Sequence, residues 1–295
     1  MRIEFHPSRL PVLTRWTAEK ILSAGEGEVE VSLDLGLTVS RVRVAGGSLF
    51  LPGGEELPVE EVRELEENDV YLVRDGRVFK AAFFADGRYY RLLAVRPDSA
   101  PTLEISGVRM HRTEGITPWR DAELKVRCLG VRPGSSVLDI GTGLGYTAMW
   151  SLRLGSSSVI TVEKDRNVLR MAEMNPWSRG LSEERVKILL GDALEIIGEF
   201  DEASFDRVIN DPPRFALAGE LYSSHFYREI FRVLRDGGWL YHYVGEPGRR
   251  RRKDIPAGVI RRLRECGFEG VRRAVGGVLA RKPRRPGAVR QARTS

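Results

Sequence analysis

The sequence predicts an α/β fold: a doubly wound domain with a mainly parallel sheet in the second half, preceded by a smaller β-rich domain. The first observation is that apolar strand patterns alternate with helical patterns from Thr117 onward, which is typical of parallel sheets covered by helices. The second is that the chain before about Met110 alternates apolar and polar residues between glycine-containing turns, the pattern of antiparallel hairpins. We expect a β-rich domain at 1–112, the α/β domain at 113–283, and a basic, disordered tail at 284–295.

The N-terminal domain is expected to consist of hairpins. The strand patterns are EVEVSLDLG, LTVSRVRVAGG, DVYLVRDGRVFKAAFFADG and RYYRLLAV. Asp75-Gly76 and Asp86-Gly87 are the clearest turn signals between them. The acidic interval 59–69 is expected to form a short helix between strands, and no catalytic cluster is evident in this half.

The second domain is expected to begin with a helix over WRDAELKVRCLG, opened by Pro118. A strand (VLDIG), a glycine-rich turn and a helix over 146–154 follow. The remaining expected strands are VITVEKD, VKILLGD, FDRVIND and WLYHYVG, and the remaining helices are RNVLRMAEMNP, SSHFYREIFRVLRDGG and IPAGVIRRLRECGF. GVRRAVGGVLARKP is expected to close the domain as a hairpin.

Charge is distributed unevenly along the chain. The net charge is +6, but residues 249–295 contain 16 Lys+Arg against 3 Asp+Glu, which leaves the first 248 residues at −7. A basic end on an otherwise acidic chain indicates a polyanionic partner, most often nucleic acid. The alternative is a solvated basic surface with a disordered tail.

Composition excludes several other classes. No apolar run reaches transmembrane length and no secretory signal pattern opens the chain, so we expect a cytoplasmic protein without a membrane partner. Cys128 and Cys266 are too few for a disulfide framework, and no histidine, cysteine and carboxylate set has metal-ligand spacing. Forty arginines against seven lysines, with only four asparagines and one glutamine, favour a thermophile or a GC-rich genome.

The glycine-rich turn LDIGTGLGYTA is the first candidate for a cofactor site. Its glycines follow a strand and precede a helix, where the backbone can turn sharply and helix N–H groups are free to bind a ligand. The spacing is G-x-G-x-G instead of G-x-G-x-x-G, a pattern seen in S-adenosylmethionine enzymes. The candidate cofactor residues here are Asp139, Gly141, Thr142, Gly143 and Gly145, with Asp139 near the methionine end.

Two acidic residues at later strand ends extend this site. Glu163, 22 residues after Gly141, is placed to accept both ribose hydroxyls and is followed by Lys164. Asp192, after the strand VKILL, is placed to accept from the adenine amine, and Ala193 can supply a neighbouring backbone N–H. Each acid alone could be a solvated loop carboxylate, but their order at successive strand ends indicates one site.

The segment Asn210-Asp211-Pro212-Pro213-Arg214-Phe215 ends the fourth strand and is the candidate catalytic element. With it, residues 117–283 resemble the class I S-adenosylmethionine-dependent methyltransferases, which have a Rossmann-like domain. The Asp-Pro-Pro element resembles the [DNS]-P-P-[aromatic] motif of methyltransferases that act on exocyclic amines of bases. GITPWRDAELKV together with NDPPRFALAGELYS resembles a family of archaeal predicted methyltransferases, which includes an enzyme methylating a cytidine amine in small-subunit ribosomal RNA.

The resemblance implies a chemical role for each catalytic candidate. An exocyclic base amine is a poor nucleophile because its lone pair is delocalised into the ring. If Asp211, also near the cofactor, and the carbonyl of Pro212 accept its two hydrogens, the lone pair can turn toward the methyl sulfonium. Pro212 and Pro213 hold these acceptors in a fixed backbone shape. Transfer then depends on in-line placement more than on strong base catalysis.

One position departs from the motif. Arg214 occupies the slot of the aromatic that stacks on the base, although a guanidinium plane can also stack or bind a phosphate. Phe215, Trp119 or Tyr222 could provide the aromatic contact instead. Arg249, Arg250 and Arg251 are expected at the rim where RNA enters the site. The candidate substrate-binding residues are therefore Phe215, Trp119, Tyr222, Arg249, Arg250 and Arg251.

Three functions remain open at this point. The leading prediction is an RNA base amino-methyltransferase acting on cytidine N4 of ribosomal RNA. The second is a methyltransferase for a small molecule or a protein side-chain amide. The third is a non-catalytic RNA-binding protein on the same scaffold, against which the intact glycines and acids argue.

Overall fold

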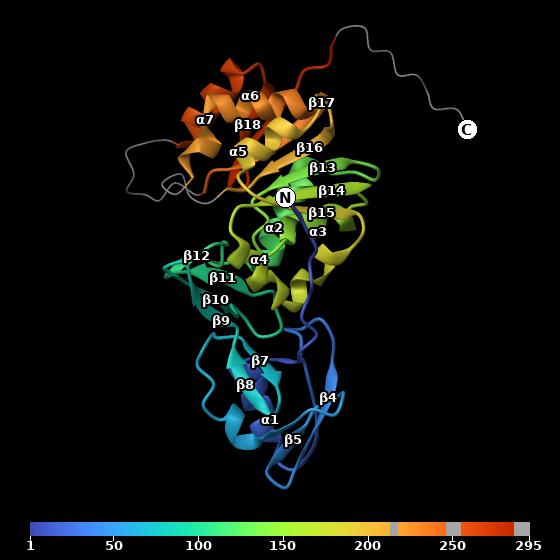
Figure 1. Ribbon diagram of the computed structural model, residues 1–295, viewed down its shortest axis with the longest axis vertical. Helices are drawn as coiled ribbons and strands as arrows, with labels where there is room; N and C mark the ends of the chain where they lie inside the picture. Colours follow the sequence, from blue (N-terminus) through green and yellow to red (C-terminus); the bar gives the residue numbers. More distant parts are fainter. Residues whose placement is uncertain (213–217, 246–254, 286–295) are drawn as a thin grey trace, which may run out of the picture.

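The computed structural model describes residues 1–212, 218–245 and 255–285, and an eight-stranded sheet lies at its centre (Figure 1). The strand order is β1-β15-β14-β13-β16-β17-β19-β18. Strands β13 to β17 run parallel, whereas β1 at one edge and the β18–β19 hairpin at the other add antiparallel pairs. The strands are β1 (Arg2–Ile3), β13 (Ser136–Ile140), β14 (Ser158–Glu163), β15 (Val186–Leu190), β16 (Phe205–Asn210), β17 (Leu234–Tyr243), β18 (Glu269–Ala274) and β19 (Gly277–Arg281). The predicted fold class and the closing hairpin are confirmed.

Helices cover both faces of this sheet because side chains alternate along each strand. On β13, Val137 packs with the cluster that includes α2 to α4, whereas Leu138 and Ile140 pack with the cluster of α5 to α7. The helices are α2 (Pro118–Leu129), α3 (Tyr146–Arg153), α4 (Arg166–Glu173), α5 (Ala193–Ile196), α6 (Ser224–Val233) and α7 (Ile255–Glu265), with 3₁₀ turns η2 (Pro176–Ser182), η3 (Ile197–Glu199) and η4 (Gly219–Tyr222). Thr117 caps α2 by accepting a hydrogen bond from the backbone N–H of Arg120, as the expected start at Pro118 requires.

The N-terminal region contains three small sheets, as its hairpin pattern predicts. Their strand orders are β12-β11-β10-β9, β2-β7-β8 and β3-β4-β5-β6. The strands are β2 (Val12–Leu13), β3 (Gly27–Val31), β4 (Ser40–Ala45), β5 (Ser48–Phe50), β6 (Glu56–Pro58), β7 (Tyr71–Arg74), β8 (Arg77–Lys80), β9 (Ala82–Ala85), β10 (Arg88–Leu93), β11 (Thr102–Ile105) and β12 (Val108–Arg109).

Two helical segments of this region differ from the expectation. Helix α1 (Arg15–Ala24) was not expected; Thr14 caps it, and Ala18 and Ile21 pack three residues apart into the N-terminal core. The acidic interval 59–69 forms only the short 3₁₀ turn η1 (Val59–Val62). Its acidic residues are therefore mostly in turns and not on a helix face.

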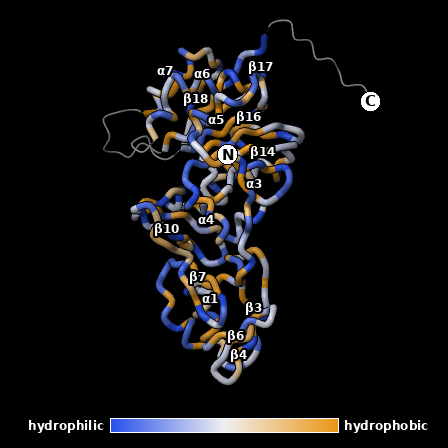
Figure 2. The backbone as a smooth tube through the Cα atoms, in the orientation of Figure 1, coloured by the Kyte–Doolittle hydropathy of each residue, from blue (hydrophilic) through white to orange (hydrophobic). Residues whose placement is uncertain are grey.

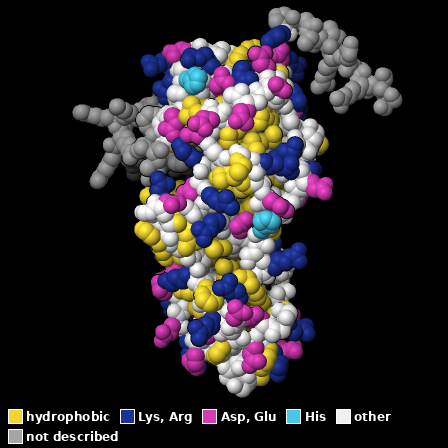
Figure 3. All heavy atoms as spheres, viewed as in Figure 1, with side chains coloured by type: hydrophobic (Ala, Val, Ile, Leu, Met, Phe, Trp, Pro, Cys, Tyr) yellow, Lys and Arg dark blue, Asp and Glu magenta, His cyan; other side chains and the backbone are white. Residues whose placement is uncertain are grey.

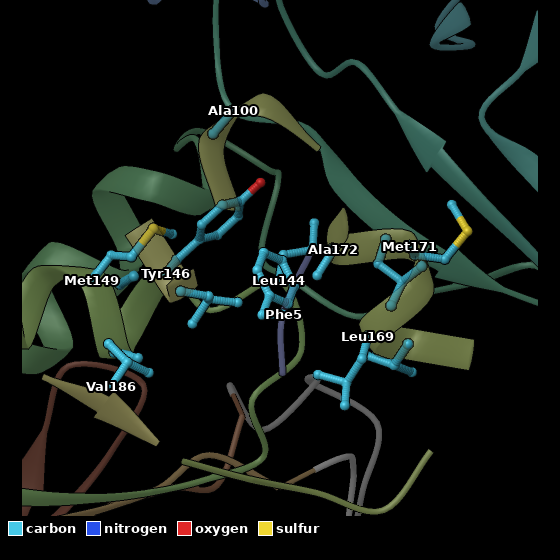
Figure 4. Packing of buried hydrophobic residues seen from close by; sticks show 14 of the residues in the cluster. Phe5, Ala100, Leu144, Tyr146, Met149, Leu169, Met171, Ala172 and Val186 are labelled. Carbon is cyan, nitrogen blue, oxygen red and sulfur yellow. The ribbon is translucent and has the colours of Figure 1, made fainter. Parts of the chain in front are cut away.

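One hydrophobic cluster joins the N-terminal region to the central sheet. It contains Phe5 and Ala100 together with Tyr146 of α3, and Figure 4 shows these side chains packed around Leu144. The hydroxyl of Tyr146 donates to the carbonyl of Pro101 over 2.8 Å. Figure 2 shows apolar stretches both in the N-terminal strands and in the central sheet. Since β1 also lies in the central sheet, the first residues of the chain are part of it, and the boundary at 112/113 stays a prediction.

Among the described residues, no helix combines the length and the apolar character needed to cross a bilayer.

Candidate cofactor and substrate site

The glycine-rich turn joins β13 to α3 at the carboxyl end of β13. Gly141, Gly143 and Gly145 have φ angles of 90°, 53° and 77°. A Cβ atom on Gly141 would lie 2.6 Å from the carbonyl oxygen of Asp211, so only glycine allows the turn to lie this close to the Asp-Pro-Pro segment. Gly145 gives α3 no side-chain cap, which leaves first-turn N–H groups for a ligand.

Asp139 is completely buried beneath this turn. Its Oδ1 accepts a hydrogen bond from Thr147 Oγ1 at 2.9 Å, and its Oδ2 accepts from Thr161 Oγ1 at 3.0 Å. The Thr161 hydroxyl also lies 2.7 Å from that of Thr142. Burial raises the pKa of Asp139 to about 7. Asp139 and Thr142 therefore take part in hydrogen bonds that link β13, β14 and α3. Their contact with the cofactor stays a prediction.

Glu163 directs its carboxylate at the glycine turn from the end of β14. Its Oε2 accepts from the backbone N–H of Gly143 at 3.0 Å, and its Oε1 accepts from those of Lys164 and Asp165 at 2.9 and 3.0 Å. Burial raises the pKa of Glu163, although these N–H groups oppose the rise. Glu163, the carboxylate predicted to bind the ribose, therefore lies beside the predicted glycine-rich turn.

Asp192 follows the neighbouring strand β15 and caps α5. Its Oδ1 accepts from the backbone N–H of Leu194 at 2.9 Å, and its Oδ2 pairs with Lys164 Nζ at 2.7 Å. This hydrogen bond from Lys164 lowers the pKa of Asp192. Ala193 is the first residue of α5. The structure therefore brings Glu163, Lys164, Asp192 and Ala193 to the same edge of the sheet.

A buried lysine that was not among the predicted site residues holds the side chain of Asp211. Lys125 Nζ lies 2.8 Å from Asp211 Oδ2 and 3.1 Å from Asp121 Oδ2, and 4.2 Å from the centre of the Tyr243 ring. The side chains of Lys125, Asp121 and Asp211 are 8%, 6% and 20% exposed. Burial lowers the pKa of Lys125, but the charges of Asp211 and Asp121 outweigh burial and raise it above its ordinary value.

A signal for this network was present in the sequence. Asp121 and Lys125 are four residues apart on α2, and they lie on the same buried face as Ala122, Val126 and other apolar residues. Charged residues are almost never fully buried unless they are paired. A charged i,i+4 pair on the apolar face of a helix therefore indicates a third partner in the fold, which here is Asp211.

Asn210, directly before Asp211, is held in the core by a second polar group. Its Nδ2 donates to the carbonyl of Leu221 at 3.1 Å and lies 2.8 Å from His242 Nδ1. Burial lowers the pKa of His242 to about 3, so the imidazole is neutral near pH 7. Tyr222 packs edge-on against this imidazole with ring centres 4.6 Å apart, and only 2% of the residue is exposed. Tyr222 thus supports the Asp-Pro-Pro segment from inside, and its contact with substrate stays a prediction.

Trp119 lies in an aromatic cluster at the start of α2. Its ring centre is 5.7 Å from Tyr146, 5.2 Å from Trp150 and 5.2 Å from Trp177. The Trp150 indole N–H donates to the carbonyl of Trp119 at 3.0 Å. These contacts explain the position of Trp119 through packing, and a substrate contact for it stays a prediction.

Of the remaining predicted site residues, the structure describes only Pro212. Pro212 is buried at the end of the described segment 1–212. Pro213, Arg214, Phe215, Arg249, Arg250 and Arg251 lie outside the described residues. Within the part of the chain that the structure describes, no group of three or more histidine, cysteine or carboxylate side chains is arranged to hold a metal ion.

A glycine turn with carboxylates at the ends of the next parallel strands defines the class of the second half: an S-adenosylmethionine-dependent methyltransferase domain. Residues 138–242 match the family described as methyltransferase domain. The chain belongs to one family with the uncharacterized protein MJ1233 of Methanocaldococcus jannaschii. The two are 44% identical over 280 residues, which cover 92% of this chain and 96% of that protein. The cofactor is S-adenosylmethionine, and the close approach at Gly141 and the carboxylates of Glu163 and Asp192 fit it.

Two more distant similarities cover part of the chain. Ribosomal RNA large subunit methyltransferase I of Photobacterium profundum is 26% identical over 163 residues, 50% of this chain and 40% of that protein. A crystal structure of spermidine synthase in complex with the transition-state analogue AdoDATO superposes with a TM-score of 0.56 at 21% identity, over 68% of this chain and 72% of that one. The second similarity shows a shared fold.

Proposed function

We propose that this protein transfers a methyl group from S-adenosylmethionine to an exocyclic amine of an RNA base, with cytidine N4 of small-subunit ribosomal RNA as the acceptor. The observation that carries this proposal is the position of Asp211. Its backbone carbonyl lies against the glycine turn at Gly141, and its carboxylate is held in place by Lys125. A carboxylate acceptor therefore stands directly beside the cofactor turn.

The Asp211 carboxylate, fixed in position by Lys125, can orient a weakly nucleophilic amine. Lys125 takes one oxygen of Asp211, and within residues 1–212, 218–245 and 255–285 the other oxygen, Oδ1, has no hydrogen-bond donor. Oδ1 can accept one amine hydrogen, and the carbonyl of Pro212 is the second acceptor that the motif implies. Because the acceptors are fixed before the substrate binds, little reorganisation is needed when the lone pair turns toward the methyl group.

Different residues are assigned to different parts of S-adenosylmethionine. We assign Glu163 to the ribose hydroxyls, and Asp192 with the N–H of Ala193 to adenine, while Lys164 holds Asp192 in place. Asp139 and Thr142 keep the turn in shape below the methionine end. When bound, S-adenosylmethionine supplies an electrophilic methyl group. Transfer would break the sulfonium–methyl bond, release the cofactor as the neutral thioether and leave the amine nitrogen positively charged, and the proton of that nitrogen would then pass to water.

Further support for an RNA substrate comes from charge and from similarity. The segment 249–295 carries 16 Lys+Arg against 3 Asp+Glu, which favours a polyanion. A ribosomal RNA methyltransferase is among the proteins similar to the domain. A basic substrate such as a polyamine would be repelled by this segment.

The test is methyl transfer from labelled S-adenosylmethionine to total RNA from a strain that lacks the gene, followed by nucleoside mass spectrometry. We expect label in one cytidine species with the wild-type protein, loss of label with Asp211→Ala, and retained label with the exposed control Asp201→Ala. Cofactor binding should persist in all three proteins. Label in proteins or small molecules instead of RNA would overturn the proposal, and RNA binding without transfer to any acceptor would indicate a non-catalytic RNA-binding protein.

A further inference from the structure

The sheet β12-β11-β10-β9 buries one face and exposes part of the other. Tyr90, Leu92 and Leu103 face the core and are at most 1% exposed. On the opposite face, Phe84 of β9 and Tyr89 of β10 are 71% and 39% exposed, and the register places them directly opposite each other. Directly opposed side chains have Cβ atoms about 5 Å apart, so two exposed aromatic side chains leave the sheet next to each other. We name this pair the aromatic platform.

Arginines border the aromatic platform. Arg91 follows Tyr89 by two residues and therefore lies on the same face, where it pairs with the carboxylate of Glu104. Arg109 lies opposite Glu104 on β12, and its side chain is 52% exposed. Figure 3 shows hydrophobic and basic side chains together on the surface at the level of this sheet. Aromatic rings beside guanidinium groups are the combination that binds single-stranded nucleic acid.

The N-terminal region has an acidic first segment and a basic second segment, and the basic segment carries the aromatic platform. Residues 74–112 contain 8 Lys+Arg against 4 Asp+Glu, a net of +4. Residues 1–73 contain 7 Lys+Arg against 14 Asp+Glu, a net of −7. A polyanion is therefore attracted to the segment that carries β9 to β12 and repelled by the segment before it.

The buried face of the same sheet is fixed to the cofactor site. The Tyr90 hydroxyl donates to Asp165 Oδ2 at 2.6 Å, and Asp86 at the β9–β10 turn accepts from Asn167 Nδ2 at 2.8 Å. The backbone N–H of Asp165 in turn donates to Glu163 Oε1. Figure 1 shows the sheet beside α4, which begins directly after Asp165. A chain held on the exposed face would thus be held at a set position relative to the site.

We propose that the aromatic platform, with Arg109 at its border, binds the single-stranded RNA next to the nucleotide that is methylated. This inference rests on the proposed function and names where the RNA lies outside the site. Bases stack on Phe84 and Tyr89, which requires no particular sequence because every base has a π face. The guanidinium of Arg109 contacts the backbone phosphates. The acidic distal sheet β3-β4-β5-β6 makes no contact with RNA.

The test is fluorescence anisotropy with the full chain and a labelled single-stranded RNA of mixed sequence, compared with the same RNA annealed to its complement. Each stacking ring contributes about fivefold or more to affinity, so Phe84→Ala/Tyr89→Ala should bind the single strand about 25-fold more weakly. Phe84→Tyr/Tyr89→Phe keeps both rings and should bind like the wild type. Phe79→Ala, which removes an exposed ring from β8 of a different sheet, is the matched control and should change binding less than twofold. Arg109→Ala should lower the slope of log affinity against log salt by about one, whereas the ring variants leave it unchanged.

Each outcome bears on one of the two proposals. If the double alanine variant binds RNA like the wild type, the aromatic platform is rejected, while methyl transfer that depends on Asp211 still supports the proposed function. An equal loss in Phe84→Tyr/Tyr89→Phe would reject stacking as the cause. A change of oligomeric state in the alanine variant would identify a second copy of the chain as the occupant and overturn RNA. If the wild-type protein binds no RNA and transfers no methyl group to RNA, both proposals are rejected.

Discussion

Replacing Lys125 with methionine removes the cation from the buried network at Asp211. Methionine keeps most of the apolar stem but loses the ammonium group that lies 2.8 Å from Asp211 and 3.1 Å from Asp121. Two carboxylates that are 20% and 6% exposed then face each other without a counter-charge. Breaking a buried ion pair by removing one partner costs about 3–5 kcal/mol. Because Asp211 is partly exposed, we expect about 3 kcal/mol of lost unfolding free energy at pH 7.

The pH dependence of this loss has a definite sign. Without Lys125, the charged carboxylates of Asp121 and Asp211 repel each other in the folded state. Repulsion between like charges in the folded state lowers the unfolding free energy as the pH rises through the range in which carboxyl groups lose their protons. The deficit of Lys125→Met should therefore be largest near pH 7 and smaller near pH 4. Adding Asp121→Asn removes one of the two charges and should recover about 1–2 kcal/mol.

Urea unfolding at pH 4 and pH 7 measures these free energies, with the exposed Lys187→Met as the control that should change stability by less than about 0.5 kcal/mol. In the folded variant we expect cofactor binding to persist and methyl transfer to fall about 100-fold, the range for losing one preorganised electrostatic contact. A loss below about 1 kcal/mol at pH 7, or an equal loss at both pH values, would refute the reasoning.

Three further predictions concern the cofactor side of the site. Gly141→Ala places a Cβ 2.6 Å from the Asp211 carbonyl and should cost about 2 kcal/mol or more and abolish cofactor binding. The control Gly134→Ala, with similar positive φ but open space, should cost less in urea unfolding, and equal losses would contradict the close-approach argument. Glu163→Gln replaces one carboxylate oxygen that accepts from backbone N–H groups with an NH2 donor, so it should cost about 1–3 kcal/mol of unfolding free energy and weaken S-adenosylmethionine binding about tenfold in calorimetry; unaltered affinity would remove Glu163 from the ribose contact. Burial raises the pKa of Asp139 to about 7, so its deprotonation destabilises the folded protein. As the pH rises from 4 to 7, the unfolding free energy of the wild type should therefore fall by up to roughly 4 kcal/mol relative to that of Asp139→Asn. Parallel stability curves for the two proteins would show that Asp139 does not titrate in this range.

Local patterns were enough to predict the fold class and the proximity of most candidate cofactor residues. Helical and strand periodicities are properties of short segments, and their alternation implies a parallel sheet. The carboxyl ends of parallel strands lie at one edge, so the order of Gly141, Glu163, Asp192 and Asp211 along the chain already implied their proximity. Helix α1 was missed because its apolar spacing was read as part of a hairpin region.

Contacts between distant segments were decided only by the tertiary structure. Lys125 and Asp211 are 86 residues apart, and their ion pair depends on which face of the sheet α2 covers and how the helix is rotated. The same holds for β1, whose two residues pair with β15, and for Tyr90, which reaches Asp165 across 75 residues. A sequence pattern fixes the period of an element, and hence which residues share a face. What that face meets is set by the packing of all elements together, and for this protein that packing placed a lysine on the proposed catalytic carboxylate.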